Sequence, residues 1–298
     1  MLTLPKNTFQ PFFTDLMEKA VNEEHILAGF NVFSLDDAYA VVGAAEQIGA
    51  PVMLMINKLA VGLFPVEMWA DTLNMLTKYA SVPVCAHLDH TTDFAVLERA
   101  CKAGFDSVMF DGSQLPLEDN IAQTRKVVEM AHGLGVAVEA EIGAVGYSDG
   151  AGGKHYKAAM TDPLEAGRFA RETGVDWLAV SIGNVHRMET QDAVIDFDLL
   201  ADIERQTDVP LVLHGSTGIK DDDMRKLLGT HVVKVNIGTA LRMAFGNTLR
   251  GEFEKDVQAF DRTALFQTPL KRVGEEAMKK MRMLGCQGIV EPKTEKGR

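Results

Sequence analysis

Short apolar runs rich in valine, isoleucine, leucine and phenylalanine recur along the chain, and longer segments with helical periodicity separate them. The runs return roughly every 25–35 residues, which is the spacing of strand–helix units. We expect eight strands, at residues 27–33, 51–56, 83–87, 105–110, 136–141, 176–182, 209–214 and 231–236. Helices are expected between them, chiefly at 36–48, 65–79, 93–102, 117–132, 163–172, 198–207 and 221–228.

This alternation over 298 residues predicts an α/β fold, a single-domain (β/α)8 TIM barrel. The barrel would occupy about residues 27–240 and follow an N-terminal helix near 9–22. Extra C-terminal helices at 239–260 and 269–284 would form an extension over about 241–285, before a polar tail at 286–298. An open, doubly wound sheet is the alternative. It is less favoured because no G-x-G-x-x-G motif follows the first predicted strand.

The composition bears on location and partners. With 46% hydrophobic and 24% charged residues the chain is ordinary for a globular protein, and no apolar run is long enough to span a bilayer. The first residues lack the basic region and apolar stretch of a signal peptide. Cys85, Cys101 and Cys286 have no C-x-x-C spacing, and the net charge is -12. We therefore expect a cytoplasmic protein with free thiols and no membrane or nucleic-acid partner.

Polar and ionisable residues gather where the predicted strands end, and in a TIM barrel these ends form the catalytic face. Three histidines from separate strand ends, with a carboxylate beside the first, suit one divalent metal ion and an acid/base group. We expect His90, at the start of a loop, to bind the metal with His186 and His214, and interpret His87 as a core histidine. The strand-end residues are Asn31, Asn57, Asp89, His90, Asp111, Glu141, Asn184, His186, His214 and Asn236.

Carboxylates near the predicted barrel mouth need partners, because an unpaired buried charge is costly. Asp111 and Glu141 are expected either at a second cation position or as groups that orient a histidine. Glu139 is equally consistent with a structural pairing to Lys234 in the barrel interior. A Schiff-base role for Lys234 is less favoured, because an imine mechanism needs no metal cluster.

Glycine-rich segments follow the seventh and eighth predicted strands, at 215–218 and 236–239. TIM barrels commonly bind phosphate at these two positions, so the pair favours a phosphorylated substrate. A longer glycine-rich stretch at 143–155 is either an ordinary flexible loop or a lid that carries an acid/base group at Asp149 or His155.

Six motifs occur together along the chain: HLDH at 87–90, SVMFDGS at 107–113, VEAEIG at 138–143, AVSIGNVH at 179–186, LHGSTG at 213–218 and KVNIGT at 234–239. As a set they resemble the class II, zinc-dependent ketose-bisphosphate aldolases, which include the fructose- and tagatose-bisphosphate aldolases. The resemblance extends from Phe30 and Asn31 to about Ala244. It implies reversible cleavage of a ketose (bis)phosphate to dihydroxyacetone phosphate and an aldehyde, through a metal-stabilised ene-diolate.

The resemblance also implies roles for individual residues. His90, His186 and His214 would hold one catalytic Zn2+, with Asp111 and Glu141 around a possible second divalent site. Asp89 would exchange the proton of the C4 hydroxyl, and Asp149 is a candidate acid/base in the lid. A monovalent cation (Na+ or K+) and a homodimer or homotetramer are common in that family. The sugar and its phosphate would contact Asn31, Asn57, Arg187, Gly215, Ser216, Thr217, Asn236, Ile237, Gly238 and Thr239.

Some positions depart from the pattern of that family. Arg187 replaces the glycine that usually follows the second zinc-binding histidine, where a guanidinium would contact the anionic group or change which group is accepted. Residues 146–149 have lost one lid glycine and most of the acids, and Asn57 replaces a serine or threonine. The alternatives are therefore a barrel acting on a related, non-standard sugar phosphate, or a non-catalytic barrel subunit. A barrel hydrolase is less favoured, since residues 30–32 are Phe-Asn-Val rather than His-x-His.

Overall fold

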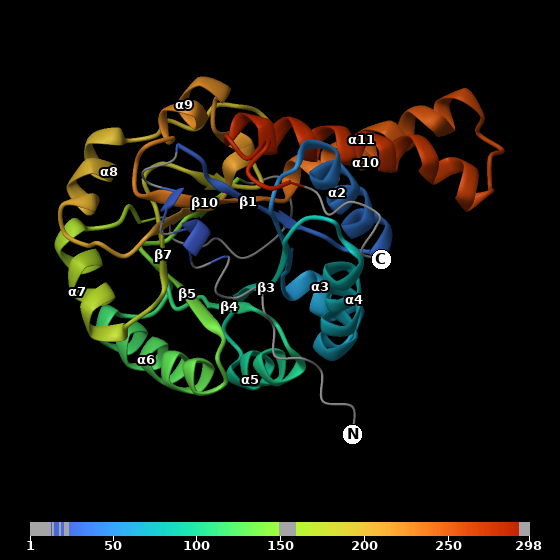
Figure 1. Ribbon diagram of the computed structural model, residues 1–298. Coiled ribbons are helices and arrows are strands. Elements are labelled where there is room, and N and C mark those ends of the chain that lie inside the picture. The colour runs from blue at the N-terminus through green and yellow to red at the C-terminus, as the bar shows by residue number, and fades with distance from the viewer. Residues whose placement is uncertain (1–12, 14, 18, 21–23, 149–158, 292–298) are drawn as a thin grey trace.

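Eight parallel strands close into a barrel in the computed structural model, which describes residues 13–291 except 14, 18, 21–23 and 149–158. The order around the barrel is β1-β10-β9-β7-β5-β4-β3-β2, so the first strand pairs with the last. Figure 1 shows the strands around a common centre with the helices outside them, which confirms the predicted TIM barrel. The strands are β1 (Leu27–Asn31), β2 (Val52–Ile56), β3 (Val84–Thr91), β4 (Ser107–Phe110), β5 (Ala137–Ile142), β7 (Trp177–Val180), β9 (Leu211–Leu213) and β10 (Val232–Ile237).

The helices around the barrel begin and end at residues suited to those positions. At α5 the Asp93 side chain accepts hydrogen bonds from two N–H groups of the first turn, and Gly104 ends the helix in the left-handed conformation. In the part of the chain that the structure describes, no helix is both long and apolar enough to cross a membrane. The helices of the ring are α2 (Leu35–Ile48), α3 (Lys58–Leu63), α4 (Val66–Tyr79), α5 (Phe94–Ala103), α6 (Leu117–Gly133), α7 (Pro163–Thr173), α8 (Phe197–Glu204) and α9 (Asp221–Lys226).

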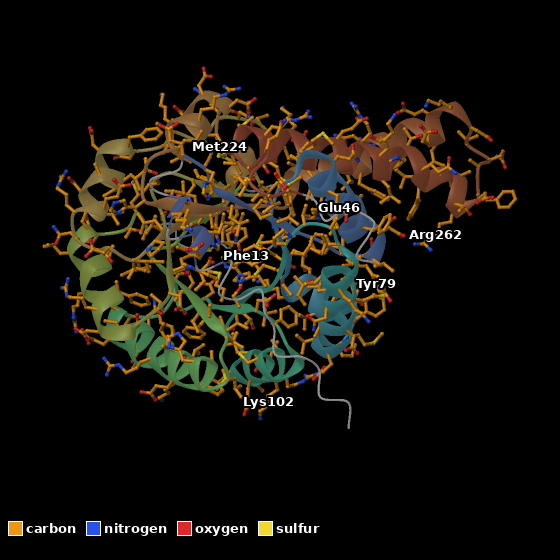
Figure 2. The ribbon with its side chains drawn as sticks, viewed as in Figure 1. Phe13, Glu46, Tyr79, Lys102, Met224 and Arg262 are labelled. Atoms are coloured by element: carbon orange, nitrogen blue, oxygen red, sulfur yellow. The ribbon has the colours of Figure 1, made fainter. Side chains whose placement is uncertain are left out.

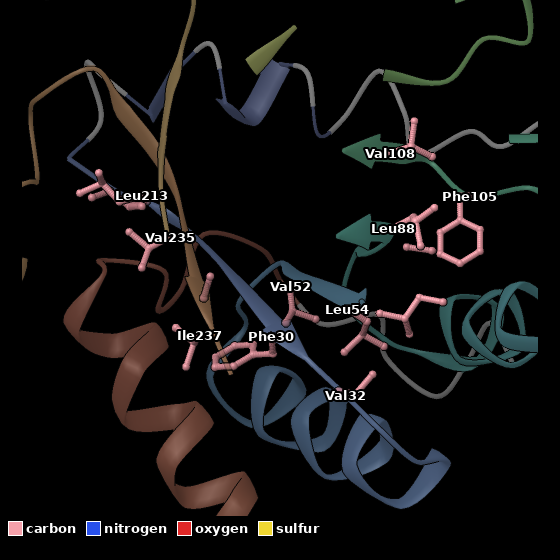
Figure 3. Packing of buried hydrophobic residues seen from close by; sticks show 14 of the residues in the cluster. Phe30, Val32, Val52, Leu54, Leu88, Phe105, Val108, Leu213, Val235 and Ile237 are labelled. Carbon is pink, nitrogen blue, oxygen red and sulfur yellow. The ribbon is translucent and has the colours of Figure 1, made fainter. Parts of the chain in front are cut away.

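Side-chain alternation along the strands produces two hydrophobic layers. On β2, Val52 and Leu54 pack under the helices, whereas Met53 and Met55 belong to the interior cluster. Figure 3 shows the outer layer, in which Phe30 lies beside the residues of neighbouring strands. All five side chains are completely buried. Burial of each such side chain contributes roughly 1.5–3 kcal/mol, which makes the barrel a firm support for the residues at its mouth.

The N-terminal helix lies at the amino ends of the barrel strands, opposite the carboxyl ends that hold the predicted site. Residues 13, 15–17, 19 and 20 are helical, within the predicted 9–22. Phe13 and Met17 share a buried cluster with Leu27 and Trp177, which are the first residues of β1 and β7. Figure 2 shows Phe13 near the middle of the ring. The helix therefore covers the amino ends of the strands and leaves the carboxyl ends to the functional residues.

Two long helices follow β10, namely α10 (Thr239–Lys255) and α11 (Arg262–Met283), and their distal ends extend beyond the barrel (Figure 1). The second begins earlier than the predicted 269. Asp261 caps it by accepting hydrogen bonds from the N–H groups of Thr263 and Ala264, and Pro269 lies inside the helix. Proline favours the first turn of a helix and disrupts its interior, which is why the pattern predicted a start at this residue.

The polar tail predicted from residue 286 begins later. Cys286 is completely buried, and its Sγ contacts the carbonyl oxygen of Ile26 at 2.9 Å. Gly288 and Val290 donate backbone hydrogen bonds to the carbonyl groups at the end of α2 and of the residue after it. Backbone pairing therefore holds residues 288–290 against the end of α2.

Candidate metal and substrate site

An irregularity in β3 brings Asp89 and His90 to the same side of the barrel mouth. His90 lies within the strand, not in the following loop as predicted. Strict alternation would direct these neighbours to opposite faces. The pairing of β3 with β4 shifts register between Leu88 and Thr91, and His90 has a φ of 38°, in the left-handed region. Non-glycine residues rarely adopt that conformation, and it concentrates at functional sites.

Four side chains, three from strands and one from the residue after β9, converge beside Asp89. One ligand atom from each of His90, Glu141, His186 and His214 lies within 4.8 Å of the others. The donors are three imidazole nitrogens and one carboxylate oxygen, a set that binds Zn2+ and other divalent ions. Asp111 is not in this group among the described residues. The structure thus brings together the three predicted histidines and one of the two predicted carboxylates.

Carboxylates orient two of the histidines. His90 donates from Nδ1 to Asp111 Oδ2, and His214 donates from Nε2 to Glu139 Oε1, both at 2.8 Å. These bonds direct His90 Nε2 and His214 Nδ1 toward each other, at 2.6 Å. Metal-binding histidines commonly have such a carboxylate partner, which fixes the ring and the tautomer. Asp111 therefore orients the ring of His90, and Glu139 orients the ring of His214.

The electrostatics of the cluster favour a positive charge between these nitrogens. Burial alone would lower the pKa of His90, but the carboxylates of Asp89 and Asp111 outweigh it and raise the pKa to about 10. Burial raises the pKa of Glu141 to about 8, with a contribution from Asp111. Glu141 Oε2 is buried and has no hydrogen-bond partner among the described residues. A divalent cation would satisfy this oxygen and both nitrogens, so the residues fit a metal ion.

A chain of amide side chains positions Asp89. Asn31 Nδ2 donates to Asp89 Oδ2 at 2.9 Å, and Asn236 Nδ2 donates to Asp89 Oδ1 at 3.0 Å. Asn57 in turn donates to Asn31 Oδ1 at 3.3 Å, and its own Oδ1 accepts from the N–H of Leu59 at the start of α3. Asp89 is 2% exposed and lines the pocket. Its carboxylate is thus held in one orientation by side chains of β1 and β10 and, through Asn31, by Asn57 at the start of α3.

Most of the residues predicted to bind substrate surround one pocket beside the cluster. Ile237 is the exception, because it points outward on β10 and packs in the hydrophobic layer under the helices. Asp149 and His155 lie outside the described residues. The predicted residues that line the pocket are Asn31, Asn57, Arg187, Gly215, Ser216, Thr217, Asn236, Gly238 and Thr239.

Comparison with known proteins identifies the family. The family described as "Fructose-bisphosphate aldolase class-II" matches residues 13–289, nearly the whole chain. The chain belongs to this family. It is a class II aldolase, and hence a lyase.

Relatives of this aldolase differ in the sugar that their names give. The chain is 33% identical over 282 residues to the D-tagatose-1,6-bisphosphate aldolase subunit GatY of Klebsiella oxytoca, covering 92% of this chain and 97% of that protein. It is 34% identical over 231 residues to the sulfofructosephosphate aldolase of Alkalicoccus urumqiensis, covering 77% and 80%. The crystal structure of the YdjI aldolase from Escherichia coli K12 has a TM-score of 0.80 at 30% identity and covers 94% of this chain and 98% of that one.

The pocket of the aldolase includes five residues that were not predicted at the site, namely Phe33, Lys58, Leu59, Tyr147 and Arg242. Lys58 and Arg242 add two positive side chains to the pocket. The Tyr147 ring stacks on the His186 ring and also contacts the Arg187 guanidinium. Lys58 follows a predicted strand-end residue directly, and Arg242 lies one helical turn after Thr239, so proximity to the predicted strand ends was an available signal. Nothing in the linear sequence pairs Tyr147 with residues 40 positions away.

The aldolase has a buried ion pair beneath the cluster. Lys234 Nζ donates to Glu139 Oε2 at 2.6 Å, and both side chains are fully buried, which is the structural alternative considered for Glu139. Burial raises the pKa of Glu139, but Lys234 and the hydrogen bond from His214 outweigh it and hold the pKa well below its usual range. His87 bonds to Ser107 Oγ at 2.8 Å, which confirms its interpretation as a core histidine. The lysine is engaged in the interior, and this arrangement favours metal over imine chemistry.

Proposed function

We propose that the protein is a zinc-dependent aldolase that reversibly cleaves a ketose (bis)phosphate to dihydroxyacetone phosphate and an aldehyde. The observation that carries the proposal is the convergence of His90, His186, His214 and Glu141 beside a fixed carboxylate, Asp89, in one pocket. A Zn2+ held by these four residues would act as a Lewis acid and stabilise the negative charge that develops when the C3–C4 bond breaks.

Asp89 is the group that we assign to proton transfer. In cleavage its carboxylate would take the proton of the C4 hydroxyl, and in condensation it would return the proton to the aldehyde oxygen. The amide donors Asn31 and Asn236 hold both of its oxygens, so the carboxylate meets the substrate in one orientation. Asp149 remains a prediction as the lid acid/base, as do the second divalent site, the monovalent cation and the homo-oligomer.

Two loops after β9 and β10 support a phosphate site. Ser216 Oγ donates to the carbonyl of Asn236 at 2.6 Å, and the N–H of Ala240 donates to Thr217 Oγ1 at 3.1 Å, so the loops form one unit. The amino end of α10 begins at Thr239, in the same pocket. A helix amino terminus attracts anions, and the three cationic side chains of the pocket, Lys58, Arg187 and Arg242, do the same.

The proposed reaction is tested by screening ketose mono- and bisphosphates, with coupled detection of dihydroxyacetone phosphate. The panel includes tagatose 1,6-bisphosphate and sulfofructose phosphate, since the named relatives act on them. We expect dihydroxyacetone phosphate from at least one ketose phosphate, dependent on Zn2+. A zinc-loaded, folded protein that releases it from none of them would contradict the proposal and favour a non-catalytic barrel subunit.

Arg187→Gly, assayed on the same panel, should change the order of substrate preference, because the variant removes one of the positive charges of the pocket. The φ of Arg187 is 58°, which glycine adopts without strain, so we expect the free energy of unfolding to stay equal or rise by about 1 kcal/mol. Thermal denaturation provides the folding control. Unchanged relative rates across the panel would remove Arg187 from substrate selection.

A further inference from the structure

Tyr147 and Arg187 make a cation–π contact that the proposed proton transfer does not use. The short strands β6 (Gly146–Tyr147) and β8 (Val185–His186) pair in parallel, with Tyr147 opposite His186. The Tyr147 and His186 rings stack with their centroids 4.7 Å apart and their planes at 29°. The guanidinium carbon of Arg187 lies 5.4 Å from the centroid of the Tyr147 ring. Tyr147, His186 and Arg187 all line the pocket.

The backbone of Arg187 is held in a conformation that non-glycine residues rarely adopt. Its φ is 58°. Ser148, the residue after β6, donates from its N–H to the carbonyl of His186 at 3.0 Å and from Oγ to the carbonyl of Arg187 at 2.8 Å. Strained backbone persists only where the surroundings determine it, and it concentrates at functional sites. The β6 segment therefore fixes both the backbone and the side chain of this arginine.

The glycine-rich loop after β9 packs directly against β8 and the residues that follow it, on either side of Arg187. A Cβ at Gly215 would lie 2.4 Å from the carbonyl oxygen of Val185, and one at Gly218 would lie 2.6 Å from Met188 Sδ. Within the described ranges, Arg187 forms no ion pair with a carboxylate. A half-buried guanidinium without an acidic partner, beside a phosphate-type loop, is suited to bind an anion.

We propose that Tyr147 is a positioning residue that holds the Arg187 guanidinium over the pocket, where it binds the anionic group of the substrate. The inference rests on the proposed function for the identity of that group as a sugar phosphate. A position over an aromatic face leaves the guanidinium fewer conformations to lose on binding, and a cation over such a face is itself attracted. Tyr147 and Arg187 thus form one anion-binding unit, in which the tyrosine acts through the arginine.

The test measures binding of inorganic phosphate by titration calorimetry, with the zinc content of every sample determined and matched. Arg187→Met should weaken binding by at least about tenfold, since it removes charged hydrogen bonds. Tyr147→Leu should weaken it about three- to tenfold, and the double variant should bind no more weakly than Arg187→Met alone. Tyr147→Phe keeps the aromatic face and should retain most of the affinity. Tyr79→Leu removes the ring under Lys78, an exposed pair of the same kind at 5.5 Å, and is the matched control.

Unchanged phosphate affinity in Tyr147→Leu would overturn the inference, and so would additive losses in the double variant. Should Tyr147→Leu fail to fold, Arg187→Lys serves instead. It keeps the charge without the planar group, and we expect a loss of phosphate affinity like that of Tyr147→Leu. Full affinity would count against the contact between the planar guanidinium and the Tyr147 ring. Phosphate binding requires no turnover, so these results stand apart from the substrate screen.

Discussion

Asp89→Ala is expected to lower kcat for cleavage by roughly 100- to 10,000-fold, the usual range for loss of a positioned acid/base group. The carboxylate is outside the four-residue cluster, so bound zinc should remain near one equivalent per chain. Asp89→Asn keeps the volume and should lose a similar factor, which separates loss of the base from the cavity left by alanine. Steady-state kinetics and metal analysis on the same preparations measure both quantities.

Asp93→Ala is the matched control for Asp89. Asp93 lies on the same segment, and its carboxylate caps α5 by accepting hydrogen bonds from the N–H groups of Ala95 and Val96. Its loss should lower the free energy of unfolding by about 1 kcal/mol and leave kcat within about twofold. If Asp89→Ala retained kcat to the same extent as this control, Asp89 would have no part in proton transfer.

Removal of the metal is the second change that we expect to reduce cleavage strongly. Treatment with a chelator is expected to reduce cleavage by at least about 1,000-fold, because Lewis-acid stabilisation supplies several kcal/mol of the transition-state energy. Added Zn2+ should restore it. His214→Ala should purify with little zinc and show the same loss, since it removes one of the four donors and the partner of Glu139.

His132→Ala provides the comparison for the histidine variant. His132 is partly exposed on α6 and bonds to Asp176 at 2.9 Å. Asp176 directly precedes the amino end of β7, so this pair lies away from the carboxyl strand ends. His132→Ala should keep both its zinc and its activity. Cleavage that survives exhaustive chelation, with no metal found by analysis, would show that the chemistry does not need the ion.

The barrel and the gathering of three histidines at its mouth could be predicted from the sequence because both follow largely from periodicity. Apolar runs at regular spacing fix the order of strands, and a parallel barrel brings all carboxyl strand ends to one face. His90, His186 and His214 each lie near the end of such a run, so they were expected at this face, although the local backbone sets how His90 and His186 enter the cluster. The pairing of Lys234 with Glu139 was predictable for a similar reason, as both lie on barrel strands and neither charge can remain unpaired in the interior.

Features that depend on local backbone conformation or on loop contacts could not be predicted in this way. The left-handed conformation of His90 reverses the alternation that the strand pattern assumes. Ile237 lies in a predicted phosphate-binding motif, yet strand alternation directs its side chain outward. The sequence left open whether Asp111 lies at a cation position or orients a histidine, because its bond to His90 depends on side-chain orientation at one strand end. The contact of the Tyr147 ring with the Arg187 guanidinium depends on two short strands that have no pattern of their own.

The most direct test of the account is a crystal structure of the protein grown with Zn2+, with anomalous data collected on both sides of the zinc absorption edge. We predict one strong anomalous peak in the pocket, about 2.0–2.2 Å from a nitrogen of each of the three histidines and from Glu141. Zinc bound elsewhere, with the imidazoles of His90, His186 and His214 turned away from a common centre, would contradict it.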